Sequence, residues 1–193
     1  MTKFAHETAF IQNIMQAAMD SFDGTPYALT KAQKAKAHKV LVVKKPAGNG
    51  PNCSKANHKT IIINLSYWQI GNVEAGVVKG YKPTAAQTKD GYVWWREYKS
   101  FDNNPRCGGM FVKTDDVDHG NLIQVLHELA HYIQCILYWK DRSRWAFMGK
   151  SHGEGFIRLY SILRDKFCND DAVREEFIFG CNTMALVSQL DAA

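Results

Sequence analysis

The stretch that decides the fold is residues 121–137, "NLIQVLHELAHYIQCIL", which is apolar on nearly every face of a helix. Such all-round hydrophobicity is typical of a helix buried in the middle of a domain. The stretch also carries His127, Glu128 and His131 in the order HExxH. Residues four apart lie one turn apart on the same face of a helix, so both imidazoles can point at one ion. We therefore predict a central helix over residues 121–139 that holds two metal ligands.

A catalytic zinc site gives this spacing a chemical reason. Zinc takes nitrogen ligands at about 2.0–2.1 Å and leaves its fourth position to water. Glu128 is rotated by about 100° from His127, since a helix has ~3.6 residues per turn, and its side chain can reach that water as the general base. With seven histidines in 193 residues, a chance HExxH is expected roughly 0.01 times. The pattern favours one catalytic zinc ion over a core helix whose histidines are only hydrogen-bonded.

The site needs a third protein ligand, and the segment "KSHGEGF" offers two candidates, His152 and Glu154. A metzincin would continue the motif as HExxHxxGxxH, but Gln134 and Leu137 stand at the last two of those positions. That class is therefore excluded. A thermolysin-like site would use a downstream glutamate, so the choice between the two candidates depends on their local roles.

The sequence "SHGE" fits a capping box, in which Ser151 is the N-cap and Glu154 reaches back to its backbone N–H. This prediction gives Glu154 a structural role and places His152 at the first helical residue. We therefore predict His152 as the third zinc ligand, with Glu154 as the open alternative.

The segments "HELAHYIQ" and "SHGEGF" together resemble the SprT-like (Spartan-type) metalloproteases. In that family a third histidine follows HExxH on the next helix, in a pattern close to HGxxF. The resemblance implies that His127, His131 and His152 are the zinc ligands and that Glu128 is the base. It also matches Gly153 and Phe156 to the glycine and the phenylalanine of the family pattern. It also implies cleavage of proteins bound or crosslinked to DNA.

The resemblance covers residues 120–167 well and extends weakly to "IIINLSYW", where the family has an edge strand able to pair with an extended substrate. Three features depart from the family pattern. The segment between His131 and His152 is longer than the family pattern predicts. Residues 71–118 look like an insertion or hairpin, and the five cysteines contain no CxxC pair from which a C-terminal zinc ribbon could be built.

The wider pattern predicts one α+β domain over residues 1–193, zincin-like, with a small sheet, an N-terminal helix, and an HExxH helix followed by a ligand-bearing helix. Three- and four-residue apolar spacing predicts further helices, and β-branched runs bounded by turn residues predict strands. The expected helices are 3–22, 151–167 and 170–190, and the expected strands are 38–45, 59–68, 91–98 and 108–114, the last two as a hairpin.

Charge is unevenly distributed along the chain. The formal net charge is +5, yet residues 25–73 contain eight lysines and no Asp, Glu or Arg. Such asymmetry points to a polyanion such as DNA, bound non-specifically through the lysine-rich segment 31–59, or to a solvated lysine face without a partner. The candidate nucleic-acid contacts are Lys31, Lys34, Lys36, Lys39, Lys44 and Lys45.

Composition sets the class of the protein. An odd number of cysteines without CxxC pairs predicts free thiols in a reducing compartment. No apolar run is long enough to span a bilayer, and polar residues interrupt the N-terminal stretch where a signal peptide needs an apolar core. We predict a cytoplasmic monomer, associated with the nucleoid or lying in host cytoplasm if the gene is viral, which acts on protein substrates and not on membranes.

Two functions stay open at this point. The first is a zinc metallopeptidase in which Glu128 activates water. The second is a DNA-associated binding protein with a structural, catalytically inactive zinc site, which would not need a base beside its ligands. Among other candidates, Tyr132, Tyr138 and Tyr160 could stabilise an oxyanion, but their helical spacing favours the core. The remaining histidines are expected at the surface: His6, His38, His58 and His119.

Overall fold

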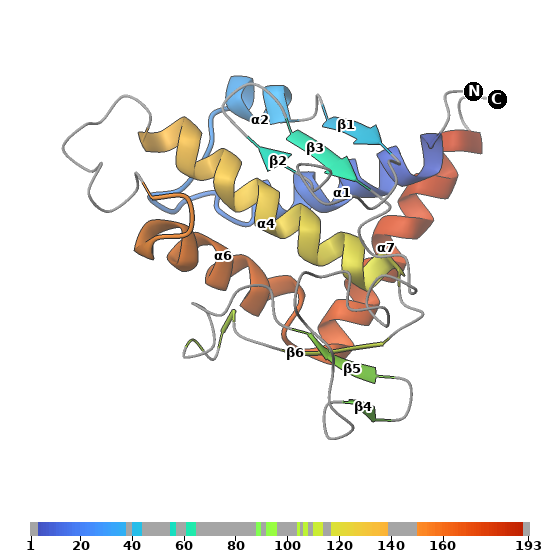
Figure 1. Ribbon diagram of the computed structural model, residues 1–193. Coiled ribbons are helices and arrows are strands. Elements are labelled where there is room, and N and C mark those ends of the chain that lie inside the picture. The colour runs from blue at the N-terminus through green and yellow to red at the C-terminus, as the bar shows by residue number, and fades with distance from the viewer. Residues whose placement is uncertain are drawn as a thin grey trace.

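The computed structural model describes residues 4–37, 40–43, 55–56, 61–64, 88–89, 92–95, 104, 106–107, 110–113, 117–138 and 150–190. These residues are mostly helical, with short strands between the helices (Figure 1). The helices are α1 (Ala5–Asp20), α2 (Lys31–Ala37), α4 (Val117–Tyr138), α6 (Glu154–Phe167) and α7 (Asp171–Leu190). The strands are β1 (Val40–Val43), β2 (Lys55–Ala56), β3 (Ile61–Asn64), β4 (Thr88–Lys89), β5 (Tyr92–Trp95) and β6 (Met110–Lys113).

The strands form two small sheets. In the first, of order β1-β3-β2, β1 runs parallel to β3 and β2 runs antiparallel to it. The second, of order β4-β5-β6, is antiparallel throughout and lies within residues 71–118. The expected pairing of segments 91–98 and 108–114 is confirmed, because Trp94 lies opposite Phe111. Helices and strands are thus both present, as an α+β chain requires.

Helix α1 follows from its apolar spacing. Its buried residues recur at three- and four-residue steps and include Phe10, Ile14 and Ala18. The helix ends at Asp20, and the chain then turns through Gly24, whose φ of 76° lies in the left-handed region that glycine adopts without steric cost. The helix expected over residues 3–22 is therefore confirmed, although it ends two residues earlier than predicted.

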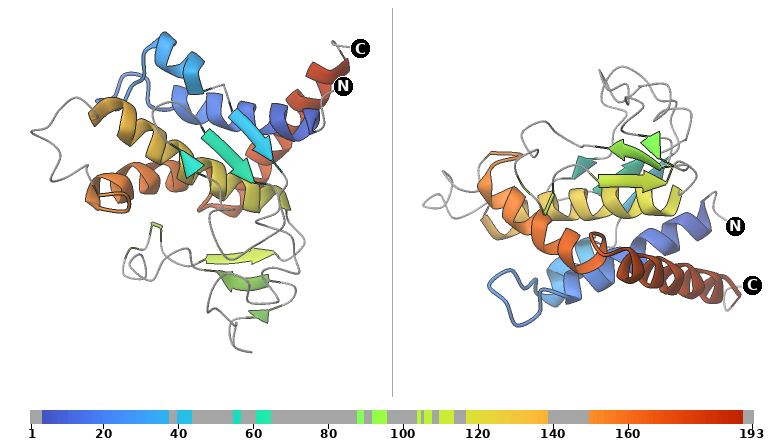
Figure 2. Two further views of the ribbon diagram at one scale, coloured as in Figure 1. Left: turned by 45° about the horizontal axis from the view of Figure 1, so that its top comes forward. Right: turned by 90° about the horizontal axis from the view of Figure 1, so that it is seen from below.

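Helix α4 is enclosed by the other elements. In Figures 1 and 2 the first sheet lies on one side of α4 and α6 on another, while α1 packs behind. Every residue from 119 to 130 is buried. The prediction of a buried central helix is therefore confirmed, although the helix begins at Val117, a turn earlier than expected.

Helix α7 is held against α1 and α4 by side-chain hydrogen bonds. The Asn13 amide nitrogen donates to the carbonyl oxygen of Cys181 at 3.0 Å, and that of Asn182 donates to Asp118 Oδ2 at 2.8 Å.

Among the described residues, no helix is long and apolar enough to cross a membrane. The four described cysteines are thiols and not disulfides, as predicted: Cys107, Cys135, Cys168 and Cys181.

The expectation that His119 lies at the surface is wrong. His119 is only 1% exposed, near the start of α4, and its Nε2 lies 3.7 Å from Cys168 Sγ. Burial, followed by the positive charges of Arg174 and Arg164, lowers the pKa of His119 from 6.5 to about 3. The apolar environment of α4 therefore keeps this imidazole neutral.

This burial predicts acid sensitivity. Between pH 6.5 and about 3 the unfolded chain binds a proton at His119 that the folded chain does not, so the stabilisation is complete above pH 6.5 and is lost as the pH falls. We expect His119→Gln, which cannot titrate, to show a smaller drop in melting temperature between pH 7 and pH 5 than the wild type. All other histidines are common to both proteins, so the difference isolates His119. Equal drops would show that His119 does not titrate in this way.

Candidate metal centre

Three histidines from two parts of the chain converge at one point. His127 and His131 project from α4, and His152 lies in the turn just before α6. The Nε2 atom of His131 lies 3.1 Å from that of His127 and 3.1 Å from that of His152, and the third pair is 3.3 Å apart. The structure thus brings together the three predicted ligands.

The spacing of these nitrogens fits a zinc ion. Ligands at ~2.0–2.1 Å with tetrahedral angles lie about 3.3 Å from one another. The observed separations of 3.1 to 3.3 Å match that value. A set of three imidazole nitrogens is also the protein donor set of some catalytic zinc sites.

Hydrogen bonding alone cannot account for the triangle. The Nε2 atom of a neutral imidazole is either a donor or an acceptor and never both. In a ring of three such atoms, at least one pair must therefore be two donors or two acceptors. A cation that accepts all three lone pairs removes this conflict, so the geometry itself favours a metal.

The electrostatics of the site keep at least one ligand in the form that binds metal. Burial, followed by the nearby His127 and His152, lowers the pKa of His131 from 6.5 to about 3. A neutral imidazole keeps the lone pair that a metal accepts. His127 is 7% exposed, whereas His131 and His152 are half-buried, so solvent reaches the cluster from the side of the last two.

Phe156 packs against all three imidazoles. It is fully buried one turn into α6, and its ring stacks on His131 with centroids 4.2 Å apart. The centroids of the other two imidazoles lie 4.8 and 5.0 Å from it. This contact restricts the rings that form the site and gives the phenylalanine of the HGxxF pattern a physical role that the sequence alone did not reveal.

The turn before α6 is tight, and it requires glycine. The Gly153 N–H donates to the Lys150 carbonyl oxygen at 3.1 Å, and a Cβ on Gly153 would lie 2.8 Å from Lys150 Cβ. The predicted capping box is wrong, because α6 begins at Glu154 with Gly153 as N-cap and no side-chain cap bond. His152 therefore lies in this turn and not on the helix, while Glu154 is exposed and outside the cluster.

Glu128 and the tyrosines lie in the core around the cluster. Glu128 follows His127 on α4 and is 6% exposed. Tyr132 and Tyr160 are buried, as their spacing predicted. Tyr132 donates its hydroxyl hydrogen to the carbonyl oxygen of Gln33 at 2.8 Å, and its pKa is raised by burial. The side chain of Tyr138 is outside the described residues.

Helix α2 was not predicted, and it begins with a capping box. The Thr30 N–H donates to Gln33 Oε1 at 2.7 Å, and the Gln33 N–H donates to Thr30 Oγ1 at 3.3 Å. The sequence "TKAQ" carries the required pattern, so the signal was available. The helix supports α4, because the main-chain carbonyl of Gln33 accepts the hydroxyl hydrogen bond of Tyr132.

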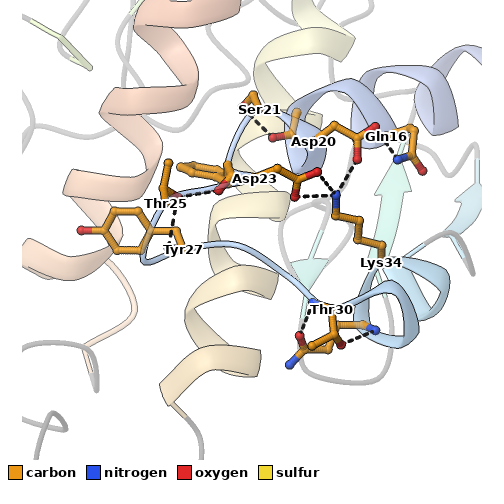
Figure 3. A network of polar contacts seen from close by, with 11 residues as sticks. Gln16, Asp20, Ser21, Asp23, Thr25, Tyr27, Thr30 and Lys34 are labelled. Atoms are coloured by element: carbon orange, nitrogen blue, oxygen red, sulfur yellow. Dashed lines mark hydrogen bonds and ion pairs between the residues drawn. The ribbon is translucent and has the colours of Figure 1, made fainter.

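Of the six candidate nucleic-acid lysines, Lys34 is engaged within the protein. Its ammonium lies 2.6 Å from Asp20 Oδ1 and 2.7 Å from Asp23 Oδ1 (Figure 3), and its side chain is 15% exposed. These hydrogen bonds, first to Asp20 and then to Asp23, raise the pKa of Lys34 above 10.5. Lys31 and Lys36 are exposed on α2, whereas Lys39, Lys44 and Lys45 lie outside the described residues.

Because Lys34 is paired within the protein whereas Lys31 and Lys36 are exposed, we expect their substitutions to have different effects. We expect the double variant Lys31→Ala, Lys36→Ala to weaken binding to duplex DNA and to reduce the slope of log affinity against log salt by up to about 2, since each phosphate contact contributes ~0.9. Lys34→Ala should leave that slope unchanged and lower the melting temperature by up to about 4 °C through its lost ion pairs. Titration at several salt concentrations checks this, and a slope unaffected by the double variant would identify a solvated face.

The chain matches no family model, no curated protein and no solved structure.

Proposed function

We propose that this protein is a zinc-dependent metallopeptidase of SprT-like type. In this proposal His127, His131 and His152 hold one catalytic zinc ion and Glu128 is the general base. The observation that carries the proposal is the triangle of Nε2 atoms, 3.1 to 3.3 Å apart, with a glutamate at the next position of the same helix.

The residues divide the chemistry between them. A bound zinc ion would lower the pKa of its water to about 7 and polarise the scissile carbonyl. Glu128 accepts the proton of the attacking water and returns it to the departing amine nitrogen. Phe156 covers one side of the imidazoles, and the half-buried His131 and His152 leave an approach for substrate.

The order of elements supports the zincin-like assignment. The metal-bearing α4 lies beside a small sheet and is followed by the His152 turn and α6 (Figure 1). In the SprT-like pattern a glycine and a phenylalanine follow the third histidine at the same positions as here. Each has a physical role in this chain, because Gly153 avoids a clash and Phe156 contacts the ligands. The exposed Lys31 and Lys36 support the finer proposal that the substrates are proteins associated with DNA.

A structural zinc site in a DNA-associated binding protein is the second candidate. It would use the same three histidines, but it would give Glu128 no chemical role. Proteolysis that depends on Glu128 therefore separates the two candidates.

Glu128→Gln should keep its zinc and lose at least about 10²-fold in peptidase rate, because a side-chain amide cannot accept the proton. The measurement is cleavage of a DNA-bound protein, with zinc content determined on the same preparation. Glu175→Gln, an exposed glutamate on α7, is the matched control and should retain full activity. Near-normal proteolysis by Glu128→Gln would contradict the assigned base.

His152→Ala should be purified without zinc and inactive, because it removes one of three ligands. Glu154→Ala should keep both metal and activity, because Glu154 is exposed and outside the cluster. Elemental analysis of the two purified variants checks this. The reverse result, metal lost with Glu154 and kept without His152, would assign the third ligand to the glutamate.

A further inference from the structure

We propose that Gln134 is a positioning residue that fastens the turn carrying His152 to the helix carrying His127 and His131, and so sets the metal site before metal binds. This inference rests on the proposed zinc site, but it does not depend on peptidase activity. Gln134 lies on α4 three residues after His131 and is 5% exposed.

One end of the Gln134 side chain holds the turn that carries His152. Its Nε2 donates to the carbonyl oxygen of Lys150 at 3.1 Å. The same oxygen accepts the Gly153 N–H at 3.1 Å. The turn is therefore closed on itself and fastened to α4 through a single acceptor, two residues before the ligand.

The position of Gln134 on α4 places this link beside the ligands. Gln134 follows His131 by three residues, so the two side chains project from the same face of α4. The hydrogen bond to Lys150 therefore fastens the His152 turn to the part of α4 that presents His131.

This hydrogen bond has one consequence. His131 and His152 are 21 residues apart in the sequence, and Gln134 ties the turn that carries His152 to the helix that carries His131. Ligands that are already in place lose little conformational freedom when the ion binds. The link through Gln134 is therefore expected to raise the affinity of the site for the metal.

The test measures zinc affinity by competition with a chelator. We expect Gln134→Leu, which has similar volume but no hydrogen-bonding groups, to bind zinc about 10–100-fold more weakly than the wild type. Its cobalt-substituted form should show an altered absorption spectrum, a change that loss of general stability would not cause. Asn121→Leu, another buried polar residue on α4, is the matched control and should bind zinc normally.

A second variant examines the same link from the turn. Gly153→Ala places a methyl group where Lys150 Cβ lies 2.8 Å away, so the turn must open and move the acceptor of Gln134. Its loss of affinity should overlap with that of Gln134→Leu, so that the double variant loses less than the product of the two single losses. Gly180→Ala on α7, where the added Cβ meets nothing within 4 Å, is the control.

Gln134→Glu has nearly the same shape but presents a carboxylate oxygen, and no N–H, to the Lys150 carbonyl. It should bind zinc more weakly than the wild type, and it serves if Gln134→Leu does not fold. Zinc affinities of both Gln134 variants within about threefold of the wild type would overturn the inference. A wild type that binds zinc but cleaves no protein would overturn the peptidase proposal alone.

Discussion

Helix α4 carries polar groups through the most enclosed part of the molecule, and the rest of the structure is arranged around that constraint. Residues 119–130 are all buried, yet they include two histidines, a glutamate and two side-chain amides. A buried polar group without partners costs on the order of 1–3 kcal/mol by mutational measures. Neighbouring helices therefore need to contribute polar atoms to this interface as well as apolar packing.

The requirement for polar partners is met differently near the start of α4 and in its second half. Near its start, His119 is kept neutral by burial and by two arginines, and it lies against the Cys168 thiol. Further along, His127 and His131 meet His152 in a group whose mutual contacts cannot all be hydrogen bonds. The first arrangement is satisfied by protein atoms. The second is suited to a cation, and under the proposed function the free energy of zinc binding would add to the stability of the α4–α6 interface.

The lysine-rich segment also has two parts with different roles. Lys34 joins α2 to the end of α1 through Asp20 and Asp23 (Figure 3), and α2 in turn accepts the Tyr132 hydroxyl of α4. Lys31 and Lys36 are exposed to solvent on the same short helix. A positive segment can therefore combine structural support for α4 with lysines that are exposed to solvent.

Local periodicity was enough to determine the central helix, its burial and the alignment of His127 with His131, because these depend on residues within one or two turns. The nature of the candidate site was also readable, since HExxH requires only helical geometry. Sequence patterns failed where a distant contact competed with a local one. The capping-box pattern occurs at Thr30 and at Ser151, but it forms only at Thr30, because the tight turn at 150–153 is held by Lys150, Gly153 and Gln134.

The sequence predicted His152 with Glu154 as the open alternative, and only the tertiary structure decided which of them lies beside the motif. His152 reaches His131 over 21 residues, and Gln134 and Phe156 gain their roles from contacts between α4 and α6 that no local spacing encodes. His119 resembled a surface histidine because its neighbours in sequence are polar, yet packing against Cys168 buries it. Lys34 resembled its neighbouring lysines until the fold placed two carboxylates beside it. The sequence by itself determined the helix and the chemistry that it can support, whereas the enclosure of α4 decided which side chains are close enough to complete the site.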